Sequence, residues 1–580
     1  MSILHQSKSQ DYRQPFGAVP VGTKVWLRAD LQDVDPASCY LVVRFEAGTT
    51  QETCSYPAPG GEIILDVFHR PGVYFYHFTA RGEEESAEHQ LTVYEADLKV
   101  PDWFKQTIIY QIFPDRFYQG EGFVESKKNS FFYGSKEDLP MYIKDENGDI
   151  LRWDFFGGNL WGVRDQLDYI QSFGVKTIYL NPIFQAVSNH RYDTGDYKHV
   201  DGLLGGDRAF DAMMTVCKEK GVRVILDGVF SHTGEESIYF DRSGLHTKDL
   251  PEEERGAWQS PKSKYRNWYS FDEDGTYACW WGVKALPNVN ELEPSYLEYT
   301  VTGKDSVIRH WMNKGVSGWR LDVADELPDG FIAHLRQAAD ESNPESVVFG
   351  EVWEDASNKV SYGSRRLYYA KKELHSNTNY VFRNALLDFF KGEIDARACM
   401  GIFLDLYENY PRENFYAQVN MTGSHDVKRL YTCMKETTKG NGDLAKDLVR
   451  AYSLIQFTFP GVPLIYYGDE TCMEGGEDPD NRRYYPWEKQ DQGMLQWFRD
   501  LGALRTGKMV FVSGEWAPIW VNSDVFAFER TDVTHKYVVA VDRFGRGTDY
   551  LCQELEKVLE KSYTIEKRAG GYGVLLQLQR

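Results

Sequence analysis

Acidic, basic and histidine side chains follow the ends of several short apolar segments in this sequence. The recurring positions are Asp227 and His232, Arg320 and Asp322, Glu351, His425 and Asp426, and Asp469 with Glu470. Three carboxylates at the centre of a concave site indicate cleavage of a glycosidic bond, in which one carboxylate attacks and another protonates the departing oxygen. Metal-dependent hydrolysis is a weaker alternative, because H-E-x-x-H is absent, as are G-x-S-x-G and a P-loop.

The segments that must position these side chains alternate with helical stretches from Pro101 to about Trp497. Seven strand-like segments cover residues 107–113 and begin near Gly174, Gly221, Gly315, Ser346, Phe415 and Gly461, and a weaker candidate lies over residues 379–388. Near-continuous apolar runs between helices predict a parallel sheet that is buried on both faces. Eight strands match a (β/α)₈ TIM barrel, whose catalytic groups stand at the C-terminal ends of the strands. The alternative, a doubly wound sheet, would carry a Gly-rich phosphate loop after its first strand, where IIYQIFPDRF stands instead.

The chain is too long for one ordinary domain, and its pattern of apolar residues changes along its length. Residues 1–100 contain short alternating apolar segments and predict an N-terminal β-sandwich. Residues 101–230 and 291–505 form the predicted α/β barrel. Residues 231–290, rich in Trp, Tyr, Gly and charge, are too many for a simple loop and predict a subdomain inserted after the third strand. Residues 506–580 predict a C-terminal antiparallel β domain.

The composition excludes several other classes of protein. The 580 residues carry a formal net charge of −22, which disfavours binding to nucleic-acid phosphates or to an anionic membrane surface. Aromatic residues make up 15% of the chain, which excludes wholesale disorder and leaves rings for a binding surface. The N-terminus lacks the apolar stretch of a signal peptide, and Pro460 and Pro463 interrupt the longest apolar stretch, so we expect a cytoplasmic protein without a membrane span. The eight cysteines form no C-x-x-C pair and are expected to be reduced, unless export lets Cys39 and Cys54 pair.

Four segments carry a resemblance to a known family. GWRLDVADE (318–326), FGEVW (349–353), SHD (424–426) and DGVFSH (227–232) resemble the four ordered sequence regions of the α-amylase family of glycoside hydrolases, family 13. Four further segments also resemble the family, and all eight stand in the order that the family shows: FFGGNLWGV (155–163), YLNPIF (179–184), NHRYDTGDY (189–197) and YYGDE (466–470). The resemblance extends from Asp102 to Pro486.

The resemblance implies a role for each matching residue. Asp322 matches the nucleophile, and Arg320, on the same side of the strand, would keep that carboxylate ionised. Glu351 matches the general acid and base, a role that requires a proton near neutral pH. Asp426 matches the third carboxylate, which binds sugar hydroxyls. The substrate-binding set implied by the resemblance is His190, Tyr192, Asp227, His232, Arg320, Trp353, His425, Asp478 and Arg482.

Other features are similar to one group within the family. LPNVN (286–290) resembles the MPKLN of neopullulanases, cyclomaltodextrinases and maltogenic amylases, and GWRLDVADE resembles that group's GWRLDVANE, with Asp325 in place of Asn. Ser231 stands where many members have an Asn that binds calcium, and GGN at Asn159 departs from the GGD of a second calcium site. We therefore expect no required cofactor and no metal ligands, and calcium is in doubt.

The resemblance implies a retaining hydrolase that cleaves α-1,4-glucosidic bonds of maltooligosaccharides, cyclodextrins, pullulan or starch, with some transglycosylation. An exo-acting α-glucosidase and a 4-α-glucanotransferase of the same family are the alternatives. A non-catalytic carbohydrate-binding relative is disfavoured, because all three carboxylates and Arg320 are present. We expect an α-glucan or maltooligosaccharide as partner, with no nucleic acid and no membrane. Dimerisation through the N-terminal domain is an expectation from related enzymes only.

Overall fold

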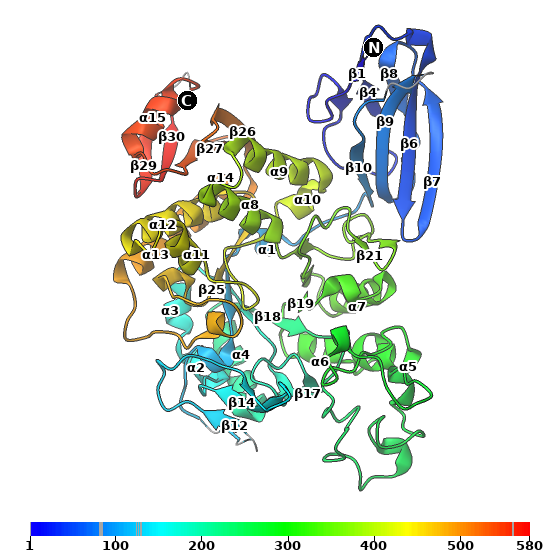
Figure 1. Ribbon diagram of the computed structural model, residues 1–580, viewed down its shortest axis with the longest axis vertical. Coiled ribbons are helices and arrows are strands. Elements are labelled where there is room, and N and C mark those ends of the chain that lie inside the picture. The colour runs from blue at the N-terminus through cyan, green and yellow to red at the C-terminus, as the bar shows by residue number, and fades with distance from the viewer. Residues whose placement is uncertain are drawn as a thin grey trace.

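The middle of the chain forms the predicted barrel in the computed structural model, which describes residues 2–80, 85–122, 124–125, 127, 130–559 and 562–579. Eight parallel strands pair in the order of the chain, and the first strand also pairs with the last. A bridge between Thr378 and Val419 closes the ring. The strands are β11 (Ile109–Ile112), β15 (Thr177–Leu180), β18 (Arg223–Gly228), β19 (Gly318–Leu321), β20 (Val347–Gly350), β23 (Ser376–Asn377), β24 (Val419–Met421) and β25 (Val462–Tyr466). Figure 1 shows β18, β19 and β25 near the middle of the molecule.

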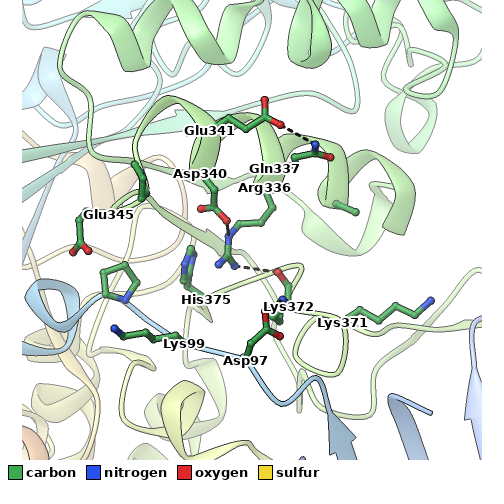
Figure 2. A pocket seen from close by; sticks show the side chains of 13 residues that line it. Asp97, Lys99, Arg336, Gln337, Asp340, Glu341, Glu345, Lys371, Lys372 and His375 are labelled. Carbon is green, nitrogen blue, oxygen red and sulfur yellow. Dashed lines mark hydrogen bonds and ion pairs between the residues drawn. The ribbon is translucent and has the colours of Figure 1, made fainter. Parts of the chain in front are cut away.

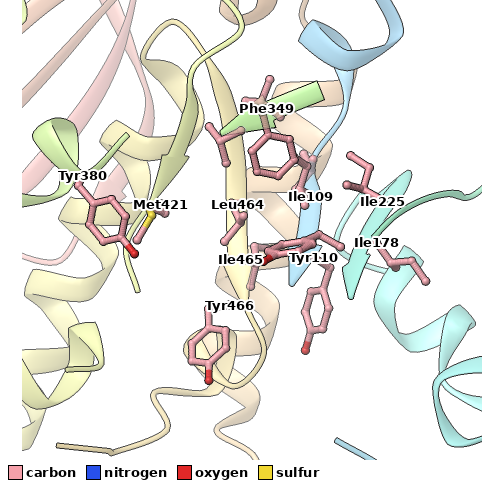
Figure 3. Close-up of a cluster of buried hydrophobic side chains, with 14 of the residues drawn as sticks. Ile109, Tyr110, Ile178, Ile225, Phe349, Tyr380, Met421, Leu464, Ile465 and Tyr466 are labelled. Atoms are coloured by element: carbon pink, nitrogen blue, oxygen red, sulfur yellow. The ribbon is translucent and has the colours of Figure 1, made fainter. Parts of the chain in front are cut away.

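Apolar side chains of the strands fill the barrel, and helices cover its outside. Ile109, Ile178, Ile225, Phe349 and Leu464 are all buried, and Figure 3 shows them in one cluster of apolar side chains from the barrel strands. Strands with both faces buried need near-continuous apolar sequence, which explains the runs seen along the chain. The main helices are α2 (Leu160–Asp165), α3 (Leu167–Gln171), α4 (Gly206–Glu219), α6 (Val307–Asn313), α7 (Asp329–Ser342), α8 (Tyr380–Lys391), α9 (Ala396–Asn409), α11 (Leu430–Thr437), α12 (Gly442–Thr458) and α13 (Gln492–Gly507).

The weak strand candidate over residues 379–388 was wrong, because these residues begin helix α8. Asn379 caps the helix, its side chain accepting a hydrogen bond from the Phe382 N–H, and Gly392 ends it at a φ of +83°. Both are typical helix boundaries. The sixth strand is instead the two-residue β23, directly before the helix. The segment from Phe415 is likewise shorter than predicted, since only Val419–Met421 forms a strand.

Two insertions extend the loops at one end of the barrel. An insertion follows the third barrel strand, β18, as predicted, and residues 231–290 contain only short 3₁₀ helices: η5 (Glu252–Glu254), η6 (Arg266–Trp268) and η7 (Trp280–Gly282). Aromatic packing holds this subdomain together, for example Trp268 against Tyr265, and Trp268 also packs against Tyr296 of the barrel segment that follows. A second insertion, which we did not predict, follows β11 and forms a small sheet of β12 (Ser130–Phe132), β13 (Ile143–Lys144) and β14 (Ile150–Phe155).

The N-terminal part is a β-sandwich, as predicted. A five-stranded sheet contains β3 (Val19–Pro20), β6 (Cys39–Ala47), β7 (Thr50–Pro57), β9 (Gly72–Ala80) and β10 (His89–Tyr94), and a three-stranded sheet contains β2 (Arg13–Gln14), β4 (Val25–Arg28) and β8 (Glu62–Leu65). A short pair joins β1 (Ser2–Leu4) to β5 (Asp30–Gln32). Residues of both larger sheets share one apolar core, such as Val25 and Phe78.

The C-terminal part is an antiparallel sheet of five strands, also as predicted. It contains β26 (Glu515–Asn522), β27 (Val525–Thr531), β28 (Lys536–Asp542), β29 (Tyr563–Ala569) and β30 (Gly573–Leu578), with helix α15 (Thr548–Glu556). The segment MVFVSGEW is not all strand, because Val510–Ser513 forms helix α14. Within the described part of the chain, no helix combines the length and the apolar character that crossing a membrane requires.

Candidate active site

The C-terminal ends of the barrel strands bring three carboxylates onto one guanidinium. Arg320, in β19, is buried and contacts Asp227 Oδ1 at 2.8 Å and Asp322 Oδ1 at 2.7 Å through Nη1. Its Nη2 contacts Glu351 Oε2 at 2.9 Å. Asp227 lies in β18, whereas Asp322 and Glu351 each follow the last residue of a strand. Parallel neighbours end at the same mouth of a barrel, so this register alone assembles the group.

Two further donors hold Glu351. The N–H of Val323 donates to Oε2 at 2.9 Å, and the indole N–H of Trp353 donates to Oε1 at 3.0 Å. Val323 has a φ of +38°, which is unfavourable for a β-branched residue and aims its N–H into the site. The Trp353 ring stacks on Tyr380 with centroids 3.9 Å apart and planes 7° apart. Glu351 is therefore held in one orientation from three directions.

The electrostatic balance at Asp322 differs from the simple expectation. Burial raises the pKa of Asp322 well above its ordinary value, Arg320 lowers this pKa, and the charges of Glu351 and Asp227 raise it again. Arg320 favours the ionised carboxylate as predicted, but burial outweighs it, because one buried cation faces several buried carboxylates. Burial raises the pKa of Asp227 in the same way, so Asp227 and Asp322 bind protons more readily than exposed carboxylates would.

Tyr192 and His425 form a stacked pair above Asp227. Their ring planes lie 6° apart with centroids 5.3 Å apart, and the Tyr192 hydroxyl donates to Asp227 Oδ2 at 2.9 Å. The same hydroxyl lies 2.5 Å from His425 Nε2. Tyr179 donates to Asp227 Oδ2 as well, at 2.5 Å. These contacts fix the tyrosine ring at the floor of the site.

The three predicted histidines are neutral at pH 7. Burial lowers the pKa of His190 to about 3 and that of His232 to about 4, and burial together with Arg482 and Arg320 holds the pKa of His425 well below its ordinary value. His232 contacts the protein through both ring nitrogens, Nε2 to the Tyr192 carbonyl oxygen at 3.2 Å and Nδ1 to Ser231 Oγ at 3.0 Å.

A second charged group borders the first. Asp426 lies 3.2 Å from His425 Nε2 through Oδ2 and 3.6 Å from Arg482 Nη2 through Oδ1. Arg482 Nη1 pairs with Asp478 Oδ1 at 2.8 Å, and the Tyr142 hydroxyl donates to Asp478 Oδ2 at 2.5 Å. Tyr142 comes from the insertion after β11, and thus this loop reaches the site.

All twelve predicted site residues lie in one network of contacts. The sequence reading missed four aromatic neighbours: Tyr142, Trp153, Tyr179 and Tyr380. Tyr179 stands in the YLNPIF segment and could have been found there, whereas Trp153, which packs edge-on against His190 at 4.9 Å, lies in the unpredicted small sheet. Tyr380 was assigned to a strand that does not exist, so its place beside Trp353 was hidden.

Metal ligands are not gathered in the described ranges. No group of three or more His, Cys, Asp or Glu residues there is arranged to hold a metal ion. Ser231, which replaces the family's Asn, is engaged with His232. Asn159 accepts hydrogen bonds from the Gly120 and Gly162 N–H groups, so its side chain closes the start of helix α2.

A cavity of about 660 Å³ lies away from these carboxylates. Figure 2 shows its lining, in which Arg336 donates to Asp340 at 2.8 Å and to the Lys372 carbonyl oxygen at 3.0 Å. Glu345 and His375, also in the lining, precede strands β20 and β23. The cavity therefore opens at the N-terminal end of the barrel, where this fold does not place its chemistry.

The fold and the site together define a class. A parallel barrel whose C-terminal mouth holds three carboxylates around one arginine has the architecture of a barrel glycoside hydrolase. Residues 111–500 match the family model for the alpha amylase catalytic domain, so the chain belongs to the α-amylase family of glycoside hydrolases, as its motifs predicted.

Individual relatives agree with this family. An amylopullulanase from Thermoanaerobacter thermohydrosulfuricus is 34% identical over 94% of this chain and 41% of its own length, and this chain spans less than half the length of the amylopullulanases it matches. A cyclomaltodextrinase from a Bacillus species is 31% identical over 78% of this chain and 75% of its own length. The ligand-free cyclic α-maltosyl-(1→6)-maltose hydrolase of Arthrobacter globiformis has a TM-score of 0.64 at 27% identity, covering 77% of this chain and 93% of that one.

Proposed function

We propose that this protein is a retaining α-glucan hydrolase that cleaves α-1,4-glucosidic bonds, with some transglycosylation. The observation that carries the proposal is the single Arg320 guanidinium that contacts both Asp322 and Glu351. Asp322 and Glu351 bind the two terminal nitrogens of one guanidinium, which keeps the two carboxyl groups close together. This suits retaining enzymes, whose two carboxyl groups lie about 5–5.5 Å apart, better than inverting enzymes, in which they lie farther apart. The names of the relatives support maltooligosaccharides, cyclodextrins, pullulan or starch as substrates.

The first step forms a glycosyl–enzyme ester. A carboxylate oxygen of Asp322 attacks the anomeric carbon, and the bond from that carbon to the leaving oxygen breaks with its electron pair on the oxygen. Glu351 gives this oxygen a proton, so the leaving sugar departs as a neutral alcohol. The donors from Val323 and Trp353 then hold the Glu351 carboxylate in place.

The second step releases the sugar. Glu351 takes a proton from a water molecule whose oxygen attacks the anomeric carbon, and the ester bond to Asp322 breaks with its electron pair on the carboxylate. A sugar hydroxyl in place of water gives transglycosylation by the same route. Two displacements on one carbon restore the α configuration.

The remaining residues bind and orient the sugar. Asp426 and the neutral His190, His232 and His425 are proposed to serve sugar hydroxyls and the distorted ring, and Tyr192 to stack under that ring. Asp478 and Arg482, next to Asp426, are proposed to bind the following sugar on the non-reducing side. Asp227 supports Arg320 and Tyr192. A cytoplasmic location and a homodimer stay predictions.

Replacing the nucleophile tests the proposal. Asp322→Asn should lower kcat on maltooligosaccharides by at least about 10⁴-fold, because an amide cannot form the ester, while the melting temperature stays close to that of the native chain. NMR of the first product from the native enzyme should show the α anomer before mutarotation. Native-like turnover by Asp322→Asn, or a β anomer as first product, contradicts the assignment.

A further inference from the structure

An exposed aromatic ring follows the proposed acid in the chain and has no place in the mechanism above. The loop after Glu351 forms a hairpin of β21 (Val360–Ser361) and β22 (Ser364–Arg365), with Tyr362 at its tip. The Tyr362 side chain is 80% exposed, and its φ is +50°. Gly363 has a φ of +74°, so the two positive φ angles are those of an ordinary two-residue hairpin turn. The large exposed ring at the tip is the unfavourable feature in the free protein, and it points to a binding role.

The hairpin is tied to the loop that follows the proposed nucleophile. Ser361 Oγ donates to the Asp325 carbonyl oxygen at 2.7 Å, and Lys359 pairs with the Asp325 carboxylate at 2.9 Å. Partial burial and the nearby carboxylates of Glu326, Asp325 and Glu291 raise the pKa of Tyr362. The tip of the hairpin therefore lies beside the turn η9 (Ala324–Glu326), directly after Asp322.

Another exposed ring reaches the same turn from the inserted subdomain. Trp281 is 80% exposed at a φ of +49°, and its indole N–H donates to Glu326 Oε1 at 2.6 Å. Burial raises the pKa of Glu326, and the charges of Asp325 and Glu351 add to this effect. Glu326 thus binds Trp281 and lies near both Tyr362 and the proposed acid.

The proposed role of Glu351 places these rings on the side of the leaving group. Glu351 protonates the oxygen of the departing sugar, so its loop borders the half of the cleft that this sugar occupies. Asp478 and Arg482 border the other half, next to Asp426. A glucan that extends past the cleaved bond consequently meets the turn at Glu326 and the rings beside it.

The N-terminal sandwich holds this hairpin from behind. Gly48, in the turn between β6 and β7, exchanges both backbone hydrogen bonds with Arg365, at 3.0 and 2.7 Å. The Arg365 guanidinium binds Glu46 Oε2 at 2.8 and 2.5 Å. Figure 1 shows β21 between the N-terminal domain and the barrel.

A second contact fixes the start of the same loop. Gln90, in β10, donates to Ser357 Oγ at 2.9 Å and accepts from Asn358 Nδ2 at 2.7 Å. Gln90 is buried and Ser357 is buried with it. Two strands of the N-terminal sheet, β6 and β10, therefore bind the loop before and after Lys359.

We propose that Tyr362 is a platform for a glucose ring on the leaving-group side, and that the N-terminal domain positions it through Glu46, Gly48 and Gln90. The inference rests on the proposed function and deepens it, because the same site would bind the acceptor sugar in transglycosylation. A glucose ring presents an apolar face of C–H groups, which packs on an aromatic ring, and the neighbouring Glu326 accepts from sugar hydroxyls.

The role of Tyr362 is tested with two substrates that differ in the group beyond the cleaved bond. Maltohexaose extends glucose rings past the cleaved bond, whereas 4-nitrophenyl α-maltoside offers only a nitrophenyl group there. Tyr362→Ala should raise KM for maltohexaose about fivefold more than KM for the nitrophenyl substrate, and should lower the ratio of transfer products to hydrolysis products. Tyr362→Phe keeps the ring and should stay within about twofold of the native chain. Equal changes on both substrates, or none, overturn the platform.

Arg365 tests the positioning by the N-terminal domain. Arg365→Ala should reproduce the selective rise in KM for maltohexaose at about threefold, with kcat on the nitrophenyl substrate nearly constant, and Arg365→Lys should restore part of it. Arg70→Ala is the matched control, because Arg70 binds Glu52 of β7 at 2.9 and 2.6 Å, and Glu52 pairs with Phe45, on the other face of the sheet from Glu46. If Arg365→Ala behaves as Arg70→Ala does, the N-terminal domain has no positioning role. An active Asp322→Asn refutes the proposed function, whereas an inactive one with a silent Tyr362→Ala refutes this inference alone.

Discussion

Arg320 shows how one side chain can organise a reaction centre. Its guanidinium contacts Asp227, Asp322 and Glu351, and the planar fork of arginine is the group best suited to bind several carboxylate oxygens at fixed angles. The same contacts set the charge balance, because Arg320 is the main cause that opposes the effect of burial on the pKa of Asp322.

Replacing Arg320 by lysine tests its two roles, which are to hold the carboxylates in place and to set the pKa of Asp322. Arg320→Lys should lower kcat/KM by about 100-fold or more, since one ammonium cannot bridge Asp322 and Glu351 in this geometry. Lysine carries the same charge but loses part of the contact to Asp322, so it lowers the pKa of Asp322 less. This pKa therefore rises, the ionised nucleophile requires a higher pH, and the acid limb of the kcat/KM profile moves to higher pH. Steady-state kinetics across pH measures both effects.

A second buried arginine provides the control. Arg429 pairs with Asp469 at 3.2 Å and contacts none of the three proposed catalytic carboxylates. Arg429→Lys should lower the melting temperature without moving the acid limb. An acid limb that moves equally in both variants would mean that general loosening, not the contact to Asp322, sets the pH dependence.

The short sixth strand and helix α8 depend on one boundary residue. Asn379 is 2% exposed, and its side chain accepts from the Phe382 N–H at 3.0 Å and donates to Asn420 Oδ1 at 3.0 Å. It thus begins the helix and links it to the neighbouring strand β24. Tyr380, the first residue of this helix, carries the ring on which Trp353 stacks.

Removing this cap should therefore cost more than removing an exposed one. Asn379→Ala should destabilise the protein by about 1–2 kcal/mol, because it loses the cap and leaves the Asn420 side chain without this partner. Asn441→Ala, at the exposed cap of helix α12 where Asn441 accepts from Leu444 N at 3.2 Å, should cost less than about 1 kcal/mol. Denaturant unfolding compares the two, and a loss no greater for Asn379→Ala contradicts the linking role.

The three parts of the chain are joined by contacts that differ in burial. Between the N-terminal sandwich and helix α9, Arg13 pairs with Glu408 at 2.9 Å, with side chains 0% and 6% exposed. Arg13 also donates to backbone oxygens of Gly17 and Gln90. Between the barrel and the C-terminal sheet, Arg412 binds Glu515 at 2.9 and 2.7 Å in an exposed pair.

Breaking the buried pair between Arg13 and Glu408 should lower the stability of the whole protein. Glu408→Gln leaves the Arg13 charge buried without its counter-ion, and we expect a destabilisation of about 3 kcal/mol, seen as a lower melting temperature in calorimetry. Glu515→Gln changes an exposed pair and should cost less than about 1 kcal/mol. Equal shifts in the two variants would mean that the N-terminal domain is not docked through this contact.

Local patterns predicted the barrel and the residues that converge at its mouth, because both depend on short stretches of sequence. A buried parallel strand needs a run of apolar residues, and the charged residue after it falls at the mouth of the barrel, so Asp227, Asp322, Glu351 and Asp426 could be read from single segments. The sixth strand could not, because two residues have no period to detect, and the helix after it is apolar enough to imitate a strand.

The linear order of residues predicted which groups do chemistry, but contacts across the chain decided how those groups are held. Family motifs and strand ends identified Asp322 and Glu351, since backbone periodicity and residue type are local properties. Three features depend on residues that are far apart in sequence. They are the net rise in the pKa of Asp322, the hydrogen bond from Tyr142 to Asp478, and the backbone hydrogen bonds between Gly48 and Arg365. Burial and proximity arise only when the strands close into a ring and the N-terminal domain packs beside it, because both are properties of packed neighbours.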